Sequence, residues 1–427
     1  MKSLWMLLGC ALSAHAAGVD KCCAQLHREL GIKISFPGQT VYNATQDTYW
    51  SLQESGLKPG CILRPSVAQD VARAVSVITA NDGCHFAIKG QGHAPAAGFA
   101  NIDGGVTIDM TGLNTTALTH DRSVVRVGAG AAWLQVYQYL DPFNVSVAGG
   151  RNGLVGVGGL TLGGGISHFT TRVGWACDNV DNFERGPVFE AFTDIATSPS
   201  FDIYASLVTA FRYNSTVKSW AISNSAVYTR PVSHPPVFDG IAAVPSVSNS
   251  SRITSLASFA DEAPTPPLNW LFSTVTLKPS TEFMLEVFDI LNSTLYAVNP
   301  QGGIVWAIAF EPLPSAVSSY AANTGGNVLG TRPEDGNSYV ILISALWPNP
   351  AANTAAEEAS RQAISRIESR ARAKGLLRKF QYLNYAAPYQ TPLVSYGAKE
   401  FEFLKRVSSK YDPLALFQRR VPGGFKL

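Results

Sequence analysis

Charge of either sign is scarce in this sequence, and neither sign is clustered. Of its 427 residues 15% are charged, and 33 Lys and Arg residues against 31 Asp and Glu residues give a formal net charge of +2. A protein that binds nucleic acid by charge needs a basic patch or stripe, and none is present. After residue 17 no run approaches the roughly 18 uninterrupted apolar residues that a membrane-spanning helix needs. We therefore expect neither a nucleic acid nor a membrane as partner.

Several common catalytic motifs are also missing. No Gly-Lys-Ser/Thr follows a glycine-rich turn, which excludes a P-loop, and no Gly-x-Ser-x-Gly is present for a serine hydrolase. The seven histidines lack ligand spacing and none belongs to a His-Glu-x-x-His, so we expect no metal site. Residues 127–132 hold the first two glycines of a Rossmann fingerprint, but Trp133 stands where the third belongs. A bulky residue there would block the packing of helix on strand.

The N-terminus has the layout of a secretory signal peptide. Lys2 is followed by an apolar run at 4–12 and by Ala14-His15-Ala16, so cleavage is expected after Ala16 or Ala17. We therefore take residues 1–17 as a signal peptide and expect a secreted protein. Six Asn-x-Ser/Thr sequons agree with export and mark candidate N-glycan sites. They lie at Asn43, Asn114, Asn144, Asn214, Asn249 and Asn292.

Cysteines are few, and all but one of those after the signal peptide stand near the front of the chain. Cys22, Cys23, Cys61 and Cys84 are expected to form two disulfides in an oxidising compartment, with the pairing left open. Cys177 stands alone in an apolar context. We expect it to be a buried free thiol, as lone cysteines commonly are.

Glycine, in contrast, is abundant, and two glycine-rich segments are candidates for ligand contact. Residues 149–165 hold nine glycines in seventeen positions. A flexible linker is the simplest alternative, but linkers are polar, and Leu and Val alternate with these glycines. In residues 89–93, Lys-Gly-Gln-Gly-His, glycines at a strand end would present successive backbone N–H groups as a nest for a pyrophosphate. His93 would stand at the tip of that loop.

The pattern of apolar residues predicts an α+β fold. In the first part it predicts a helix at 66–80 opened by a Ser66/Gln69 capping box, strands at 85–89, 106–110 and 124–127, and a helix at 133–140. From about 187 the texture changes to paired strands, with a hairpin at 205–213 and 217–229. Helices are expected at 281–296 and 354–374, the latter opened by a Thr354/Glu357 capping box and ended by Gly375.

Taken in order along the chain, these motifs resemble one family. The chain looks like a fungal member of the berberine-bridge-enzyme-like group, within the vanillyl-alcohol-oxidase superfamily of proteins with a PCMH-type FAD-binding domain. The similarity runs from about Cys22 to the C-terminus. The matching segments are 61–65 (Cys-Ile-Leu-Arg-Pro), 90–93 (Gly-Gln-Gly-His), 104–109 (Gly-Gly-Val-Thr-Ile-Asp), 155–165, 177–180 (Cys-Asp-Asn-Val), 384–388 (Asn-Tyr-Ala-Ala-Pro) and 411–413 (Tyr-Asp-Pro).

The resemblance implies a two-lobed α+β architecture. Residues 18–186 would form the PCMH-type FAD-binding domain, and 187–378 a substrate lobe with an antiparallel sheet covered by helices. Residues 379–427 would return to the FAD lobe. The protein would be a monomer that oxidises an alcohol, a carbohydrate or a related small molecule, with O2 as acceptor.

The resemblance also implies roles for individual residues. His93 matches the histidine whose ring bonds FAD covalently, and Asn152 stands where many relatives carry a second, cysteine link, so one link is expected. Tyr385 matches a residue beside the flavin and is the candidate general base, with a packing role as the alternative. A purely structural role is the alternative for His93. The implied cofactor-binding residues are Gly90, Gln91, Gly92, His93, Gly156, Gly158, Gly159, Gly163, Gly164, Asn179 and Asn384.

One departure from the family pattern limits these expectations. Relatives follow the Asp-Asn-Val segment with further strands, a helix and a turn that complete the FAD lobe. Here Glu184 passes directly to Arg185 and to a segment that resembles the start of the substrate lobe, so several tens of residues are absent. Such a loss would expose sheet edges and remove backbone donors around the flavin. The alternative function is therefore a non-catalytic secreted relic or binding protein, from a mis-spliced or degenerate oxidase gene, that no longer holds FAD.

Overall fold

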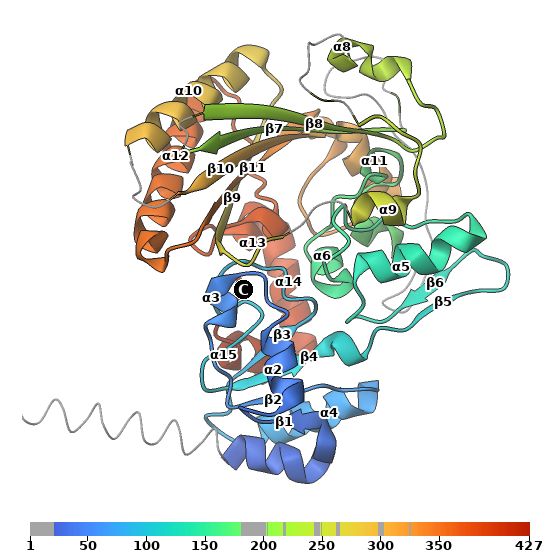
Figure 1. Cartoon of the computed structure of the whole chain (residues 1–427), viewed down its shortest axis with the longest axis vertical. Coiled ribbons are helices and arrows are strands. Elements are labelled where there is room, and N and C mark those ends of the chain that lie inside the picture. The colour runs from blue at the N-terminus through green and yellow to red at the C-terminus, as the bar shows by residue number, and fades with distance from the viewer. Residues whose placement is uncertain are drawn as a thin grey trace, which may run out of the picture.

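The structure is a computed structural model that describes residues 21–180, 202, 204–216, 219–242, 248, 250–261, 265–297, 303–323 and 326–427. The expected signal peptide, the junction of Glu184 and Arg185 and the Asn249 sequon lie outside these residues. The described chain forms a small lobe on one side of the molecule and a broad sheet with helices on the other (Figure 1). The α+β fold predicted from the sequence is confirmed.

The first lobe is built on a four-stranded sheet in the order β1-β2-β4-β3. β1 is antiparallel to β2, whereas β2, β4 and β3 are parallel to one another. Every residue of β2 and β4 is buried, as expected of central strands in a parallel sheet. The strands are short: β1 Ile34–Ser35, β2 Cys61–Leu63, β3 Phe86–Lys89 and β4 Val106–Asp109.

Two disulfides join the first helical segment, residues 21–30, to this sheet. Cys22 pairs with Cys84, just before β3, and Cys23 pairs with Cys61, the first residue of β2. The prediction of two disulfides among these four cysteines is confirmed, and the structure supplies the pairing. Cys177 is a free thiol as predicted, although half-buried rather than fully buried. Burial raises the pKa of this thiol.

Helix α4, Ala68–Thr79, lies where the sequence predicted a helix, but Asp70 holds its N-terminus instead of Gln69. The Asp70 carboxylate accepts hydrogen bonds from the backbone N–H groups of Ser66, at 2.9 Å, and Val67, at 3.1 Å. The predicted capping box was wrong by one position, because Val67, not Ser66, is the last residue before the helix.

The predicted capping box of the long helix α12, Asn353–Ala373, was also wrong. The helix begins before Thr354, and no side chain caps it. Asn349 accepts the N–H of Ala351 and so holds the short turn that leads into the helix. At the other end Gly375 adopts a φ of +67°, a left-handed conformation that favours glycine, so the predicted end is confirmed.

The middle of the chain adds short elements around α5. In this helix Trp133, Val136, Tyr137 and Leu140 are buried and recur at intervals of three and four residues, which is why the segment is a helix. The other elements are α2 Thr40–Gln46, α3 Leu52–Ser55, the hairpin β5 Thr116–Leu118 and β6 Val125–Val127, α5 Trp133–Leu140, α6 Val157–Leu162 and α7 Thr170–Val173.

The second lobe is a five-stranded antiparallel sheet in the order β8-β7-β10-β11-β9. One face packs against α10, Thr281–Ala297, and α12, and together they form the largest apolar core in the described chain (Figure 1). The predicted hairpin is the pair β7 and β8. The strands are β7 Ala205–Asn214, β8 Ser219–Tyr228, β9 Asn269–Leu277, β10 Val305–Leu313 and β11 Ser338–Trp347.

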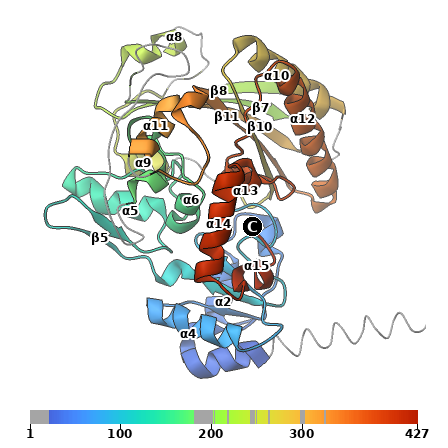
Figure 2. The same cartoon turned by 180° about the vertical axis from the view of Figure 1, so that it is seen from behind.

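The C-terminal segment returns to the first lobe (Figure 2). The ring of Phe417 meets that of Phe86 edge-on at 5.7 Å, and Arg420 binds the Asp82 carboxylate at 2.6 Å. In the described residues no helix has the length and apolar character needed to cross a membrane. The remaining helices are α8 Asp239–Ala242, α9 Leu256–Ala260, α11 Ser315–Asn323, α13 Pro392–Ser395, α14 Ala398–Tyr411 and α15 Leu416–Arg420.

Candidate functional site

The loop after β3 presents its backbone as the sequence predicted. Among the described residues, the N–H groups of Gln91, Gly92 and His93 donate no hydrogen bond. A Cβ added at Gly90 would meet no atom within 4 Å, so the space beside the loop is open. Gly92 has a φ of +69°, and a Cβ there would lie 2.8 Å from the ring of Tyr49. Unpaired backbone donors of this kind suit an anionic group.

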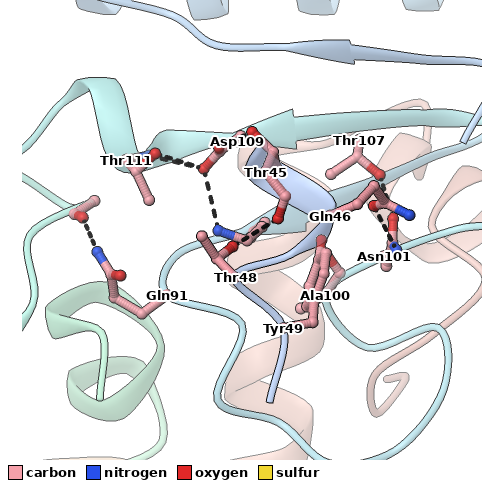
Figure 3. Close-up of polar contacts among 12 residues, drawn as sticks. Thr45, Gln46, Thr48, Tyr49, Gln91, Ala100, Asn101, Thr107, Asp109 and Thr111 are labelled. Atoms are coloured by element: carbon pink, nitrogen blue, oxygen red, sulfur yellow. Dashed lines mark hydrogen bonds and ion pairs between the residues drawn. The ribbon is translucent and has the colours of Figure 1, made fainter. Parts of the chain in front are cut away.

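A buried polar network lies next to the start of this loop, and Figure 3 labels its members Thr45, Asp109 and Thr111. The Lys89 ammonium lies 3.5 Å from the Asp109 carboxylate, and both side chains are buried. Burial lowers the pKa of Lys89, and Asp109 opposes this shift. Asp109 also accepts hydrogen bonds from the hydroxyls of Thr45, at 3.1 Å, and Thr111, at 2.8 Å. The network fixes the end of β3 and with it the start of the loop.

The glycine run at 149–165 contacts the His93 loop. This packing favours the interpretation of the run as a packed loop over the alternative of a flexible linker. A Cβ at Gly156 would lie 2.9 Å from the backbone nitrogen of Gln91, and one at Gly158 would lie 2.9 Å from the carbonyl oxygen of Ala129. Gln91 in turn donates to the carbonyl of Gly130 at 2.7 Å (Figure 3). Three glycine-bearing segments therefore approach one another closely. Gly159, on α6, faces open space.

Gly163 and Gly164 lie elsewhere, at the C-terminal end of α6. A Cβ at Gly163 would lie 1.8 Å from Oδ1 of Asn384. Asn384 donates to the carbonyl of Leu160 at 2.9 Å and to the hydroxyl of Tyr382 at 3.0 Å. Gly164 packs near Leu329 instead, so a Cβ there would be 3.1 Å from that side chain.

The side-chain amide of Asn179 makes local hydrogen bonds and does not contact the other residues predicted to bind the cofactor. Its Nδ2 donates to the carbonyls of Val173 and Trp175, the latter at 2.9 Å. The side chain thus holds the turn that follows α7.

His93 is half-buried at one end of a row of aromatic rings. It stacks on Trp50 with ring centroids 4.9 Å apart, and burial lowers its pKa to about 4. Trp50 contacts Trp270, at 4.4 Å, and Phe272, at 6.1 Å, both on β9. Phe272 in turn lies 6.4 Å from the ring of Tyr385. The row therefore links His93 and Tyr385, the two residues for which the family resemblance implied the central roles.

Tyr385 belongs to a cluster of hydrogen-bonding side chains. Its hydroxyl donates to Oε1 of Glu311 at 3.1 Å, and Arg151 donates to the same hydroxyl at 2.5 Å. Arg151 and Glu311 form an ion pair at 2.8 Å, with side chains 17% and 4% exposed. Burial raises the pKa of Tyr385 well above its ordinary value, Glu311 raises it further and Arg151 lowers it. Tyr385 is therefore protonated at neutral pH and has a carboxylate as acceptor.

Arg151 and Glu311 were not predicted from the sequence. Each carried a weak signal, since Arg151 is the one charged residue of the run at 149–165, and Glu311 is the one charged residue of the apolar strand β10. Next to them lies a cavity of about 20 Å³, enough for about one water molecule. Its polar lining, besides this ion pair, consists of Ser167, Thr170, Thr171 and Ser206.

Comparison with known proteins identifies the family. A model described as FAD binding domain matches residues 59–185. The FAD-dependent monooxygenase sdcF of Emericella nidulans is 33% identical over 472 aligned positions, which cover 96% of this chain and 98% of the relative. The chain belongs to the FAD-dependent oxidoreductases with a PCMH-type FAD-binding domain.

Other relatives and solved structures agree with this FAD-dependent family. The FAD-dependent monooxygenase tpcD of Cochliobolus heterostrophus is 29% identical over 98% of this chain and 96% of its own. The fold is similar to that of 6-hydroxy-D-nicotine oxidase from Arthrobacter nicotinovorans, with a TM-score of 0.65 at 16% identity over 91% of this chain and 96% of the other. Xylooligosaccharide oxidase from Myceliophthora thermophila gives a TM-score of 0.65 at 16% identity over 96% and 99%.

The residues of this oxidoreductase fit FAD where they are described. Free backbone donors at 91–93 suit the pyrophosphate, and the open space at Gly90 and Gly159 leaves room beside them. When bound, FAD supplies the redox chemistry by accepting a hydride from the substrate. The glycine loops would hold it, and His93 and Tyr385 would flank it.

Proposed function

We propose that this protein is a secreted oxidase that carries FAD linked covalently through His93 and oxidises an alcohol-type small molecule with O2. One observation carries the proposal: Tyr385 donates to Glu311 at 3.1 Å, and a row of aromatic rings links Tyr385 to His93. A phenol joined to a carboxylate can take the proton of a substrate hydroxyl while passing its own proton on.

In this proposal Tyr385 and Glu311 act as a relay. The raised pKa of Tyr385 keeps it protonated, so its oxygen receives the substrate proton only as its own proton moves to Glu311. Arg151 holds both partners, because it donates to the Tyr385 hydroxyl and to the Glu311 carboxylate. Its positive charge also stabilises negative charge that develops on the phenolic oxygen.

The environment of His93 supports the covalent link. Burial lowers its pKa to about 4, so the imidazole is neutral at pH 7 and keeps a free lone pair with which to bond the flavin. The stacking on Trp50 fixes the plane of the ring. Asn152 cannot form a thioether, so the bond to His93 is the single covalent link to the flavin in this proposal.

The colour of the purified secreted protein after acid precipitation tests this. A yellow pellet shows covalent flavin, and the His93→Ala variant should release its flavin into the supernatant. Retention of covalent flavin by that variant would disprove the role of His93. In the flavin-loaded protein Tyr385→Phe should keep its flavin spectrum but lower kcat by about a hundredfold to ten-thousandfold.

A second function, that of a relic that holds no flavin, is favoured by one observation. The match to sdcF extends over 472 aligned positions, more than the 427 residues of this chain, so at least several tens of positions in the relative have no counterpart here. A colourless protein that takes up no FAD when refolded with it would establish this function and exclude the oxidase.

Export and glycosylation belong to the same proposal. Asn43, Asn114 and Asn144 are exposed, as glycan acceptors must be, whereas Asn214 and Asn292 are partly buried. Digestion with an N-glycosidase should lower the apparent mass of the protein recovered from the culture medium. An unchanged mass, or retention of the protein in the cells, would contradict this part of the proposal.

A further inference from the structure

Residues 49–53, which lead from α2 into α3, bind the edge strand of the second lobe. The backbone N–H of Leu52 donates to the carbonyl of Leu268, directly before β9, at 2.9 Å. The side-chain amide of Gln53 pairs with the backbone of Trp270 on β9, donating to its carbonyl at 2.8 Å and accepting its N–H at 3.1 Å. This short segment of the first lobe is therefore fixed to β9 by backbone and side-chain hydrogen bonds.

The same segment holds the chain that follows the loop after β3. The hydroxyl of Tyr49 donates to the carbonyl of Ala100 at 2.8 Å (Figure 3), and the hydroxyl of Ser51 donates to the carbonyl of Pro95 at 2.6 Å. Because Trp50 lies between Tyr49 and Ser51, its backbone is held on both sides.

The ring of Trp50 contacts both His93 and β9. It stacks on the His93 ring with centroids 4.9 Å and planes 30° apart, and it meets the Trp270 ring edge-on at 4.4 Å. Trp50 is 8% exposed, and among the described residues its Nε1 donates no hydrogen bond. The ring is thus held by aromatic contacts and not by a hydrogen bond, so another aromatic ring could serve in its place.

Attachment of a flavin to His93 depends on the orientation of the imidazole. In that step a ring nitrogen of His93 forms a bond to a methyl carbon of the flavin ring. One hydrogen leaves the methyl group and one leaves the imidazole, as two protons and two electrons, and O2 takes them up to give H2O2. The nitrogen must meet the carbon along its lone pair, which lies in the plane of the imidazole, and a misplacement of about 1 Å can slow such a reaction about a hundredfold. A ring stacked on the imidazole restricts this plane.

We propose that Trp50 is the positioning residue for the covalent attachment of flavin, and that it acts only while β9 holds residues 49–53. The inference rests on the proposed link through His93 and adds how that link is made. Without the Trp50 ring the imidazole could turn about its side-chain bonds, so fewer of its orientations would lead to attachment. Attachment should consequently follow the docking of the second lobe on the first.

The rate of attachment tests this in the whole secreted protein. The protein is produced by riboflavin-starved cultures, mixed with FAD and precipitated with acid at intervals, and the flavin in the pellet is divided by the total flavin bound. Trp50→Ala should slow attachment at least about tenfold, whereas Trp50→Phe, which keeps a ring on His93, should stay within about threefold of the wild type. A role of Trp50 in stability alone would lower the melting temperature and the total flavin bound, but not the rate per bound flavin.

Two further variants test the part played by β9. Gln53→Ala removes both hydrogen bonds to the Trp270 backbone and should slow attachment at least about threefold. The matched control is Trp220→Ala. Trp220 lies on β8, at the opposite edge of the same sheet, and packs on Phe288 with ring centroids 4.7 Å apart. Loss of that ring removes an aromatic contact of the same kind far from His93, so the rate should change less than about twofold.

The outcomes separate the role of Trp50 from the proposed link. A wild-type rate in Trp50→Ala overturns the inference and leaves the covalent oxidase in place. Equal slowing in Trp50→Ala and Trp220→Ala also overturns it, because the effect then reflects a general loss of stability. A wild-type rate in Gln53→Ala overturns the role of β9. A wild-type pellet without flavin overturns the proposed link itself, and the inference with it. Trp50→Leu is the second variant, used if Trp50→Ala has a lowered melting temperature.

Discussion

One row of aromatic rings links the His93 loop to the Tyr385 cluster, yet the two are built from different parts of the chain. The loop offers backbone N–H groups from three consecutive residues, 91–93, supported by a second glycine segment. The cluster joins side chains of Arg151, Glu311 and Tyr385, and the first and last are 234 positions apart. A backbone site depends on glycines and can be recognised locally. A side-chain site depends on which strands and loops meet, and its members look ordinary in the sequence.

The largest effect is expected where the cluster is broken. Glu311→Ala leaves the Arg151 guanidinium, 17% exposed, without its carboxylate, and removal of one partner of a buried ion pair costs about 3–5 kcal/mol. We expect the free energy of unfolding to fall by about 3 kcal/mol in a denaturant titration. Glu311→Gln keeps the shape of the side chain and one hydrogen-bond acceptor, so its free energy of unfolding should fall by less than half of that amount. Equal losses for the two variants would show that the charge of Glu311 contributes nothing.

Near His93 the largest expected effect is on the pH dependence of folding stability. Glu54 is fully buried beneath the segment that follows His93, and its carboxylate accepts the N–H groups of Ala100, at 2.7 Å, and Gly98, at 3.3 Å. Burial raises the pKa of Glu54 from 4.5 to about 7, against the effect of these N–H groups. Between these values the folded protein holds a proton that the unfolded chain has released, so stability falls as pH rises through this window.

This shift corresponds to about 3 kcal/mol at most between pH 4.5 and pH 7 to 8. Glu54→Gln should flatten that part of the profile when the free energy of unfolding is measured from pH 5 to pH 8. His93 and His168, whose pKa values burial lowers to about 4 and about 3, act in the opposite direction. Both histidines titrate in the wild type and in Glu54→Gln, so their contributions cancel when one pH profile is subtracted from the other. Parallel profiles for wild type and variant would contradict the assignment.

The smallest effects are expected from alanine substitutions at two glycines, Gly159 within α6 and Gly163 directly after it. Gly163→Ala would place a Cβ 1.8 Å from the Asn384 amide oxygen and force that side chain away from Leu160, at a cost of about 1–3 kcal/mol. Gly159→Ala meets nothing within 4 Å and should raise the stability of the flavin-free protein by about 0.5–1 kcal/mol. If FAD lies in the open space there, the same variant should retain less flavin. Melting temperatures measure the stability of the two variants, and the flavin-to-protein absorbance ratio measures flavin retention. A destabilised Gly159→Ala protein would refute the predicted difference between the two glycines.

Much of the fold was predictable because its signals are local. The helix at 133–140 follows from apolar residues three and four apart, and the hairpin of β7 and β8 from alternation on either side of a turn. Capping residues were less predictable, because Asp70 and Gln69 are both suitable acceptors and only the observed start of α4 selects between them. The disulfide pairing could not be predicted either. Cys22 and Cys23 are neighbours, and the orientation of one helical turn decides which of them faces Cys61.

The sequence by itself determined the α+β class, the family and the glycine-bearing loop with His93 at its tip, because strand periodicity, turn chemistry and backbone exposure are encoded within a few consecutive residues. Only the tertiary structure decided that Glu311 accepts a hydrogen bond from Tyr385, that Arg151 holds them both, and that Trp50 stacks on His93. These contacts form where a strand of one lobe meets loops of the other. Their energies come from burial and charge pairing between segments far apart in the chain, and no local pattern records such a meeting.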